Sequence, residues 1–268
     1  MERHVVVTIR YSLYAPELRD SWVIGQTTEE DYLTKLLSAK RLEKREKIFD
    51  AITLKSLVGL YASKPADVNF KVYILTTNLL PEKNLSYLRI VEEKYNFIEV
   101  CALEPDTANL NSGLEEYVEK LNENDVFASV RLDDDDGLAK TFLHQLSRYL
   151  NAEFSGFVVS FAKGHGVLLN GAGDFLKMAN YKWRFGSAGL TYISTKAESI
   201  TTGRHSIYQC GNHIKTDDEF VTISDGRHAA FIRAFHSEND SEDRFEKCVG
   251  RVLSDEEAMR KYDVYNMN

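Results

Sequence analysis

The feature that most constrains this chain is a hydrophobic run that ends in four consecutive aspartates and a glycine. Residues 126–132 are typical of a buried strand, and Asp133, Asp134, Asp135 and Asp136 follow it directly. Ligands of open parallel sheets bind beyond the carboxyl ends of the strands. Hard carboxylate oxygens at such a place suit Mg²⁺ or Mn²⁺, and alternate aspartates can face the same side. The sequence therefore predicts a divalent metal site at the end of this strand.

Two other interpretations of the acidic cluster are open. It could be a solvated acidic turn, or Asp135 and Asp136 could cap a helix that starts near Leu138. We favour a metal site because four adjacent like charges repel one another unless a cation offsets the repulsion. Capping would account for one aspartate and leave three unexplained. A divalent ion could neutralise the charge that develops on a diphosphate leaving group.

The pattern of the first half predicts an α/β fold with a largely parallel, Rossmann-like sheet flanked by helices. Runs rich in Val, Ile, Phe or Tyr indicate strands at residues 5–10, 70–76, 97–103 and 126–132. Apolar residues at helical spacing indicate helices within residues 29–60, 85–95 and 114–121.

The second half is less regular and is punctuated by glycines. Strand-like pieces occur at residues 157–161, 167–169, 190–194, 220–223 and 229–235, and residues 254–262 predict a helix capped by Ser254. The glycine-rich stretches 163–166 and 171–173 lack the strand-turn-helix setting of a phosphate-binding loop, so we expect turns there. No linker or repeat divides the chain, which predicts one domain over residues 1–268.

Composition narrows the partners and the compartment. The net charge is −8, and lysines and arginines are scattered, which excludes a nucleic-acid binder. Three widely spaced cysteines form neither a disulfide framework nor a zinc motif, so we expect a reducing cytoplasm. Apolar stretches are too short for a signal-peptide core or a membrane span, so membrane contact would be peripheral at most.

The stretch Arg131-Leu132-Asp133-Asp134-Asp135-Asp136 resembles the Arg-x-Asp-Asp-Asp-Asp motif of the rhamnosyltransferase family of bacterial polysaccharide enzymes. Further similar pieces, which together cover most of the chain, are Arg10-Tyr11-Ser12, Arg41-Leu42, Ile48-Phe49, Thr53-Leu54-Lys55-Ser56-Leu57, Ser187-Ala188-Gly189-Leu190 and His236-Ser237-Glu238-Asn239-Asp240-Ser241.

The resemblance implies a GT-A-like glycosyltransferase with a Rossmann-type mixed sheet flanked by helices, in which a strand-end Asp-x-Asp motif binds Mn²⁺ or Mg²⁺ and the donor diphosphate. Residues 1–136 would form the nucleotide-sugar-binding half and residues 137–268 a less regular acceptor-side half. The donor would be a dTDP- or UDP-sugar, and rhamnose is the sugar that the family name implies. The acceptor would be a glycan or lipid-linked glycan, reached in the cytoplasm at the inner face of the membrane.

The resemblance also suggests roles for single residues. The expected metal ligands are Asp133, Asp135, Asp136 and His236. The expected donor-binding residues are Arg10, Tyr11, Arg131, Asp133, Asp134, Ser187, Asn239 and Ser241. Without the family pattern, His236 would be as consistent with a surface histidine, Tyr11 with a partly buried aromatic, and Ser187-Ala188-Gly189 with a packing contact.

An inverting transfer needs a carboxylate base, and Asp217 or Asp218 beside His213 are the candidates, with Asp174 and Asp225 as alternatives. A retaining enzyme would need no such base. Two other classes stay open. A phosphohydrolase of the haloacid-dehalogenase type also uses strand-end aspartates, and a cation- or sugar-binding module could use them without catalysis. The first fits poorly because its motif normally follows the first strand, and the second lacks EF-hand spacing.

Overall fold

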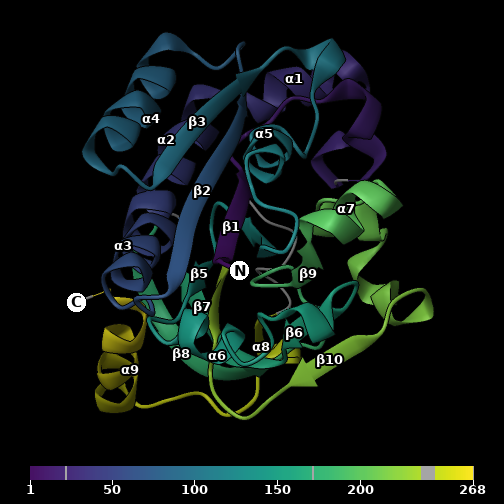
Figure 1. Cartoon of the computed structure of the whole chain (residues 1–268). Helices are drawn as coiled ribbons and strands as arrows, with labels where there is room; N and C mark the ends of the chain where they lie inside the picture. The colour runs from purple at the N-terminus through teal and green to yellow at the C-terminus, as the bar shows by residue number, and fades with distance from the viewer. Residues whose placement is uncertain (22, 171, 237–244, 268) are drawn as a thin grey trace.

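A computed structural model describes residues 1–21, 23–170, 172–236 and 245–267, and the statements below concern these residues. The core is a seven-stranded sheet in the order β10-β6-β9-β4-β1-β2-β3 (Figure 1). Its strands are β1 Arg3–Arg10, β2 Val68–Thr77, β3 Ile98–Leu103, β4 Val126–Asp133, β6 Val158–Phe161, β9 Thr191–Thr195 and β10 Thr222–Asp225.

The four strands predicted in the first half are confirmed, and they are parallel. Strand β1 lies between β2 and β4, and its register places Arg10 beside Asp133 at the carboxyl ends of two central strands. Strand β9 runs antiparallel to β4 and β6, which makes the whole sheet mixed. The α/β fold expected from the sequence, with a mixed sheet flanked by helices, is therefore confirmed.

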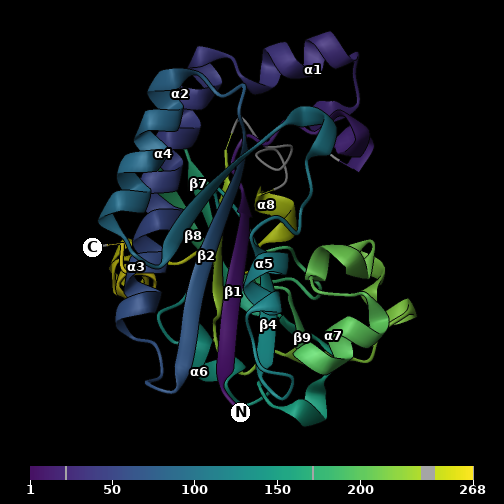
Figure 2. The ribbon, with the colours of Figure 1, turned by 45° about the horizontal axis from the view of Figure 1, so that its top comes forward.

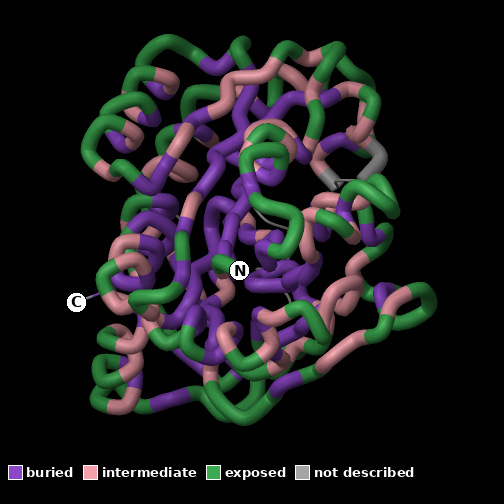
Figure 3. The backbone as a smooth tube through the Cα atoms, in the orientation of Figure 1, coloured by how far each residue is buried: buried purple, intermediate pink, exposed green. Residues whose placement is uncertain are grey.

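Helices cover both faces of this sheet because the central strands are buried on both sides. Helices α2, α3 and α4 lie on one side of β1 and β2, and α5 and α7 lie on the other (Figure 2). Alternate residues of β1 serve the two layers: Val5 and Val7 pack with the α2–α4 side, whereas Val6 packs with Leu114 of α5. The tube in Figure 3 is accordingly buried along the central strands and exposed along the outer sides of the helices.

Besides one π-helical segment, the helical elements of the described residues are α-helices and short 3₁₀ turns. The α-helices are α1 Glu29–Leu36, α2 Ala39–Ile48, α3 Lys55–Ala62, α4 Glu82–Lys94, α5 Leu114–Glu119, α6 Phe142–Leu146, α7 Lys196–Thr202, α8 Phe245–Cys248 and α9 Asp255–Tyr262. The 3₁₀ turns are η1 Pro16–Ser21, η2 Val23–Gly25, η4 Pro105–Thr107, η5 Ala152–Phe154, η6 Ile207–Cys210, η7 His213–Asp218 and η9 Asp263–Tyr265.

The helical stretch expected at residues 29–60 is divided where the chain turns extended at Ser38, the residue before α2. Helix α2 then continues without a break into α3 through one π-helical segment, η3, at Phe49–Leu54. A π turn widens the helix and changes which residues face the sheet, and such turns often occur at functional sites.

A second sheet of four strands packs against the first in the order β5-β11-β7-β8. Its strands are β5 Gly137–Leu138, β7 Lys163–Leu169, β8 Phe175–Lys182 and β11 Phe231–Phe235. The turn expected at residues 163–166 is wrong, because this segment lies in β7 between β11 and β8. Glycine is required there for packing: a Cβ on Gly164 would lie 2.3 Å from the carbonyl oxygen of Phe231.

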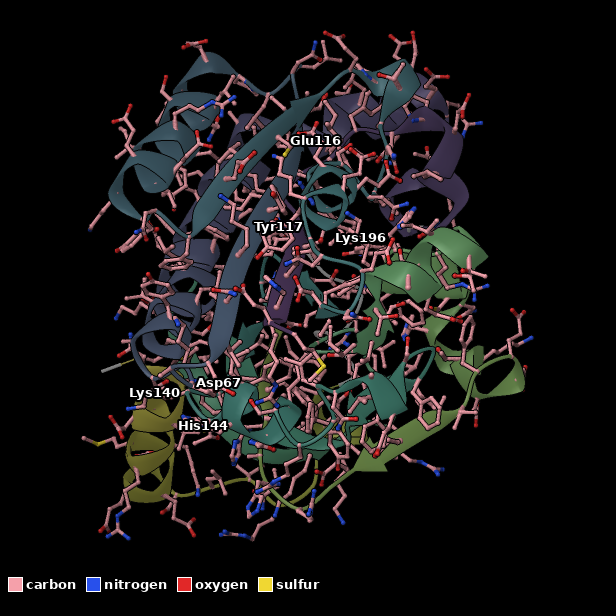
Figure 4. The ribbon with its side chains drawn as sticks, in the orientation of Figure 1. Asp67, Glu116, Tyr117, Lys140, His144 and Lys196 are labelled. Atoms are coloured by element: carbon pink, nitrogen blue, oxygen red, sulfur yellow. The ribbon has the colours of Figure 1, made fainter. Side chains whose placement is uncertain are left out.

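The described C-terminal residues include helix α9 and pack against the rest of the fold. Helix α9 confirms the helix predicted at residues 254–262, and Ser254 and Glu257 form a reciprocal capping box at its start. Lys140 Nζ lies 3.0 Å from Asp263 Oδ1, and His144 Nε2 lies 2.8 Å from the Ser63 carbonyl oxygen beyond α3 (Figure 4). No helix of the described residues is long and apolar enough to cross a membrane.

Candidate active site

The four aspartates form a turn that joins the two sheets. Asp133 ends β4 of the large sheet, and Gly137 begins β5 of the small one. The turn is closed by a hydrogen bond from the Asp136 N–H to the Asp133 carbonyl oxygen, 3.1 Å long. The interpretation of Asp135 and Asp136 as caps of a helix near Leu138 is wrong, because a strand follows the turn.

The π-helical segment and α3 hold this acidic turn from one side. The Thr53 hydroxyl donates to the Asp136 carbonyl oxygen at 2.8 Å, and the Ser56 hydroxyl accepts from the Leu138 N–H at 3.2 Å. Gly137 permits the close approach, because a Cβ there would lie 3.0 Å from Ser56 and from Ile232. The turn is therefore fixed by buried hydrogen bonds that do not involve its carboxylates.

Asp133 lies among cations. Its Oδ1 is 2.7 Å from Arg10 Nη2 and 3.6 Å from Arg131 Nη2, and it accepts a hydrogen bond from Ser187. Burial acts to raise the pKa of Asp133, but Arg131 and Arg10 outweigh burial and hold the pKa well below its usual range. Asp133 is thus an anion balanced by protein groups, and Ser187 supports it from the second half of the chain.

Asp134 points toward α2 and is almost fully buried. Arg45 binds it with two nitrogens, Nε to Oδ2 at 3.0 Å and Nη2 to Oδ1. The side chains of this pair are 11% and 2% exposed. A carboxylate held in this bidentate way has little capacity left for a ligand. Asp134, expected to contact the donor, therefore supports the turn in this structure.

Asp135 and His236 converge from opposite ends of the chain. Asp135 Oδ2 lies 3.0 Å from His236 Nε2, and His236 directly follows β11. Arg45 Nη1 approaches the same carboxylate at 3.4 Å. Burial acts to raise the pKa of Asp135, but Arg45 and His236 bring the pKa down to about 2. Asp135 is consequently ionised, and an imidazole nitrogen lies next to its oxygen.

Asp136 is buried under the start of the small sheet. Its Oδ1 accepts from the Ala234 N–H at 3.1 Å. Burial and the neighbouring Asp135 charge raise the pKa of Asp136 well above its ordinary value, although Arg233 opposes them. Two carboxylates whose charges oppose one another in a buried turn are the arrangement that a bound cation relieves.

The residues present fit a catalytic divalent ion of the kind that shares its coordination with substrate. Among the described residues, no group of three or more His, Cys, Asp or Glu side chains is close enough to enclose a metal ion. Asp135 and His236 do converge. Mg²⁺ and ions like it are usually bound by one or two protein groups, substrate phosphates and water. The expected set of four protein ligands is therefore not assembled as such.

Tyr208, on η6, is a residue of this site that the sequence did not reveal. Its ring lies 5.8 Å from the Arg10 guanidinium carbon and 5.7 Å from that of Arg131, and its hydroxyl donates to the Thr8 carbonyl oxygen at 3.2 Å. The ring is partly exposed. Because Tyr208 is far in sequence from the strands it contacts, no local pattern points to it.

Tyr11, expected to stack on a nucleotide base, is instead in the core. Its side chain is fully buried and packs edge-on against Phe49, with the ring centroids 5.3 Å apart. The interpretation of Tyr11 as a buried aromatic is the one that the geometry favours. The Tyr11 hydroxyl has no hydrogen-bond partner in the described structure.

The expected bases lie outside this cluster of contacts. Asp217 and Asp218 are exposed on η7, and no described residue forms a hydrogen bond or ion pair with either carboxylate. Asp174 is tied into a surface turn with Asn170, and Asp225 is held by Tyr149 and Arg227. Asn239 and Ser241 lie outside the described residues.

The chain resembles a number of solved structures, among them two of low identity. Residues 1–349 of TarS from S. aureus align with a TM-score of 0.41 and 10% identity, covering 87% of this chain and 60% of that one. The mannosyltransferase PcManGT from Pyrobaculum calidifontis, solved with GDP-Man and Mn²⁺, aligns with a TM-score of 0.46 and 11% identity, covering 92% and 61%. This chain thus spans about three-fifths of the length of each.

The sequence family gives a more specific match. None of the curated proteins matches the chain. The profile of the family described as "Putative rhamnosyl transferase" matches residues 4–247, which include both sheets, the acidic turn and His236. The protein therefore belongs to this family.

Proposed function

We propose that the protein transfers a sugar from a nucleoside-diphosphate donor with the help of a divalent cation held by Asp135 and His236. The observation that carries this proposal is the 3.0 Å distance between His236 Nε2, after β11, and Asp135 Oδ2, in the buried turn at the carboxyl end of β4. Such a cation would neutralise the diphosphate as it leaves the sugar. Because the chain belongs to a family described as transferases, we prefer this proposal to a phosphohydrolase or a cation-binding module.

Two arginines support a diphosphate site beside this pair. Arg10 is the last residue of β1, and Arg131 lies near the end of the neighbouring strand β4. Both guanidinium groups approach the carboxylate of Asp133. Guanidinium groups bind phosphate oxygens through parallel hydrogen bonds. We propose that the donor diphosphate lies between these arginines and the cation. Tyr208 would then supply the aromatic side chain of the donor site, the role first expected of Tyr11.

The remaining roles keep the division expected from the sequence. Residues 1–136 would bind the nucleotide sugar and residues 137–268 would serve the acceptor side. Asn239 and Ser241 keep their proposed role as ligands of the donor. We propose a dTDP- or UDP-sugar as donor, with rhamnose as the first sugar to test because of the family name. The acceptor would be a glycan or lipid-linked glycan at the cytoplasmic face of a membrane. The three free cysteines agree with a reducing compartment.

Calorimetry with nucleoside diphosphates tests the proposal. UDP, dTDP and GDP would each be titrated into the protein with Mn²⁺, with Mg²⁺ and with EDTA. We expect at least one of them to bind at least tenfold more tightly with a metal than with EDTA. Absence of metal-dependent binding of all three would overturn the proposal.

Matched variants assign that binding to the pair. Asp135→Asn and His236→Gln should each remove the metal-dependent part of the affinity while the circular dichroism spectrum stays the same. Asp174→Asn, an identical substitution in a surface turn, should bind as the wild type does. Equal behaviour of Asp135→Asn and Asp174→Asn would show that the cation lies elsewhere. Repeating the titrations with dTDP-rhamnose and UDP-glucose then identifies the preferred donor.

A further inference from the structure

His213 has the geometry of a fixed imidazole with one nitrogen available. It begins η7 and is partly exposed, and its Nδ1 lies 2.6 Å from the carbonyl oxygen of Phe185. A carbonyl oxygen only accepts hydrogen bonds, so Nδ1 carries the proton and the lone pair is on Nε2. Among the described residues, none forms a hydrogen bond with Nε2.

The segment that holds His213 is itself constrained. Phe185 has a backbone φ of 57°, a left-handed value that is uncommon for a bulky residue, and its N–H donates to Ser160 Oγ at 2.9 Å. Trp183 packs edge-on against the imidazole, with ring centroids 6.0 Å apart. Gly186 lies under the same indole, where a Cβ would be only 2.3 Å from the ring. Strained backbone that is held this firmly is concentrated at functional sites.

His213 interacts electrostatically with charged residues in and next to the acidic turn. Arg131 and Asp133 of β4 and Arg233 of β11 act on it electrostatically. Burial lowers the pKa of His213, the two arginines lower it further, and the Phe185 carbonyl and Asp133 oppose them. Other charged residues on η7 are Lys215, Asp217 and Asp218, all exposed. A histidine of this kind is neutral near pH 7 and can accept a proton.

We propose that Nε2 of His213 is the general base of the transfer reaction. The attacking hydroxyl, from the acceptor glycan or from water, forms a bond to the anomeric carbon as its proton passes to Nε2. The bond from that carbon to the diphosphate oxygen breaks, and the electron pair leaves with the diphosphate. The displacement inverts the anomeric configuration. This inference rests on the proposed function, and it replaces Asp217 and Asp218 in the role expected from the sequence.

Donor hydrolysis is the assay that needs no known acceptor. The full chain with Mn²⁺ would be given dTDP-rhamnose, UDP-glucose and GDP-mannose, and the donor with the fastest turnover would be used. General bases contribute about 10²- to 10⁴-fold, so His213→Gln should lower kcat at least 100-fold. Binding of the matching nucleoside diphosphate should change less than twofold. His228→Gln, the same substitution in an exposed loop, should leave kcat unchanged.

Three readouts separate a base from a structural residue. The wild-type rate should rise with pH to a plateau, and the midpoint of the rise should lie below pH 6.5, the ordinary imidazole pKa. The His213→Gln variant should lose this dependence on pH. Nitrogen NMR should show the Nδ1-protonated tautomer of His213. NMR of the released sugar should show inversion.

Each contrary result is assigned to one proposal. The base assignment would be overturned by an unchanged kcat and pH profile in His213→Gln, or by retention of configuration at the anomeric carbon. It would also be overturned if Asp217→Asn or Asp218→Asn lost 100-fold in kcat while His213→Gln stayed active. Failure of the wild type to bind any nucleoside diphosphate with a metal would instead overturn the proposed function.

Discussion

Replacing Arg45 by methionine should lower the free energy of unfolding more than replacing any exposed charged residue of the same helix. Arg45 binds Asp134 through two nitrogens, and it also approaches Asp135. At an effective dielectric of about 20, two charges about 4 Å apart attract by about 4 kcal/mol. Methionine fills much of the arginine volume, so the main loss is the charge, and the Asp134 carboxylate is left buried without its cation.

The expected cost follows from the burial of this pair. Removing one partner of a buried ion pair destabilises a protein by about 3–5 kcal/mol, because the other charge stays in a poor solvent. Lys47 and Glu43 on the same helix are 58% and 64% exposed, and solvent screening leaves an exposed pair of this kind with little effect on stability. Lys47→Met is therefore the matched control.

Urea unfolding followed by circular dichroism, in EDTA so that no cation replaces Arg45, measures both variants. Arg45→Met should lose about 3–5 kcal/mol and Lys47→Met less than about 1 kcal/mol. Arg45→Met combined with Asp134→Leu should regain part of the loss, because the uncompensated carboxylate is gone. A loss below about 1 kcal/mol in Arg45→Met, or no recovery in the double variant, would refute the argument that Asp134 needs Arg45 as its buried cation.

Two further predictions concern the elements around the turn. Gly137→Ala should cost about 1–3 kcal/mol, because the new Cβ meets Ser56 and Ile232 at 3.0 Å, and it should lower the melting temperature by about 2–4 °C per kcal/mol; an unchanged melting temperature would contradict the close packing. Burial lowers the pKa of His165 to about 4, below the unfolded value of about 6.5, so its stabilising contribution is complete above pH 6.5 and declines as the pH falls toward 4. Between pH 7 and pH 4.5, the wild type should lose about 2–3 kcal/mol more than His165→Gln, and parallel losses in the two proteins would contradict this assignment.

The sequence predicted the first half of the fold because its signals are local. Buried parallel strands such as β1 and β2 are continuous hydrophobic runs, and residues 5–10 and 70–76 carry that pattern. Strand β8 was missed because it is an edge strand that carries charged and exposed residues. The glycines of β7 suggested a turn from the sequence alone. The reason for Gly164 is its packing against Phe231, about 70 residues away, and no local pattern indicates such a contact.

The candidate site was predicted in composition and only partly in geometry. Four aspartates after a hydrophobic strand located the acidic turn, and the family resemblance pointed to His236. Their individual roles depended on Arg45, Tyr208 and His213, which reach the site from three separate elements. One sequence carries no signal for such long-range pairing. Tyr11 was misplaced because residues after a parallel strand can turn either to the ligand or to the helical layer.

The π-helical segment also limits how the length of this protein can vary. Arg45 lies before this segment and Ser56 after it, on one uninterrupted helix, and both contact the acidic turn. The π turn accommodates one residue more than an α-helical turn, and an α-helix advances 100° per residue, so inserting a further residue between Arg45 and Ser56 would rotate the part of the helix beyond it by about that angle. The Ser56 hydroxyl would then face away from the turn while Arg45 stayed in place. Homologues that gained a residue here would need a second, compensating change, so we expect the spacing of 11 positions between Arg45 and Ser56 to be inherited together with the π turn.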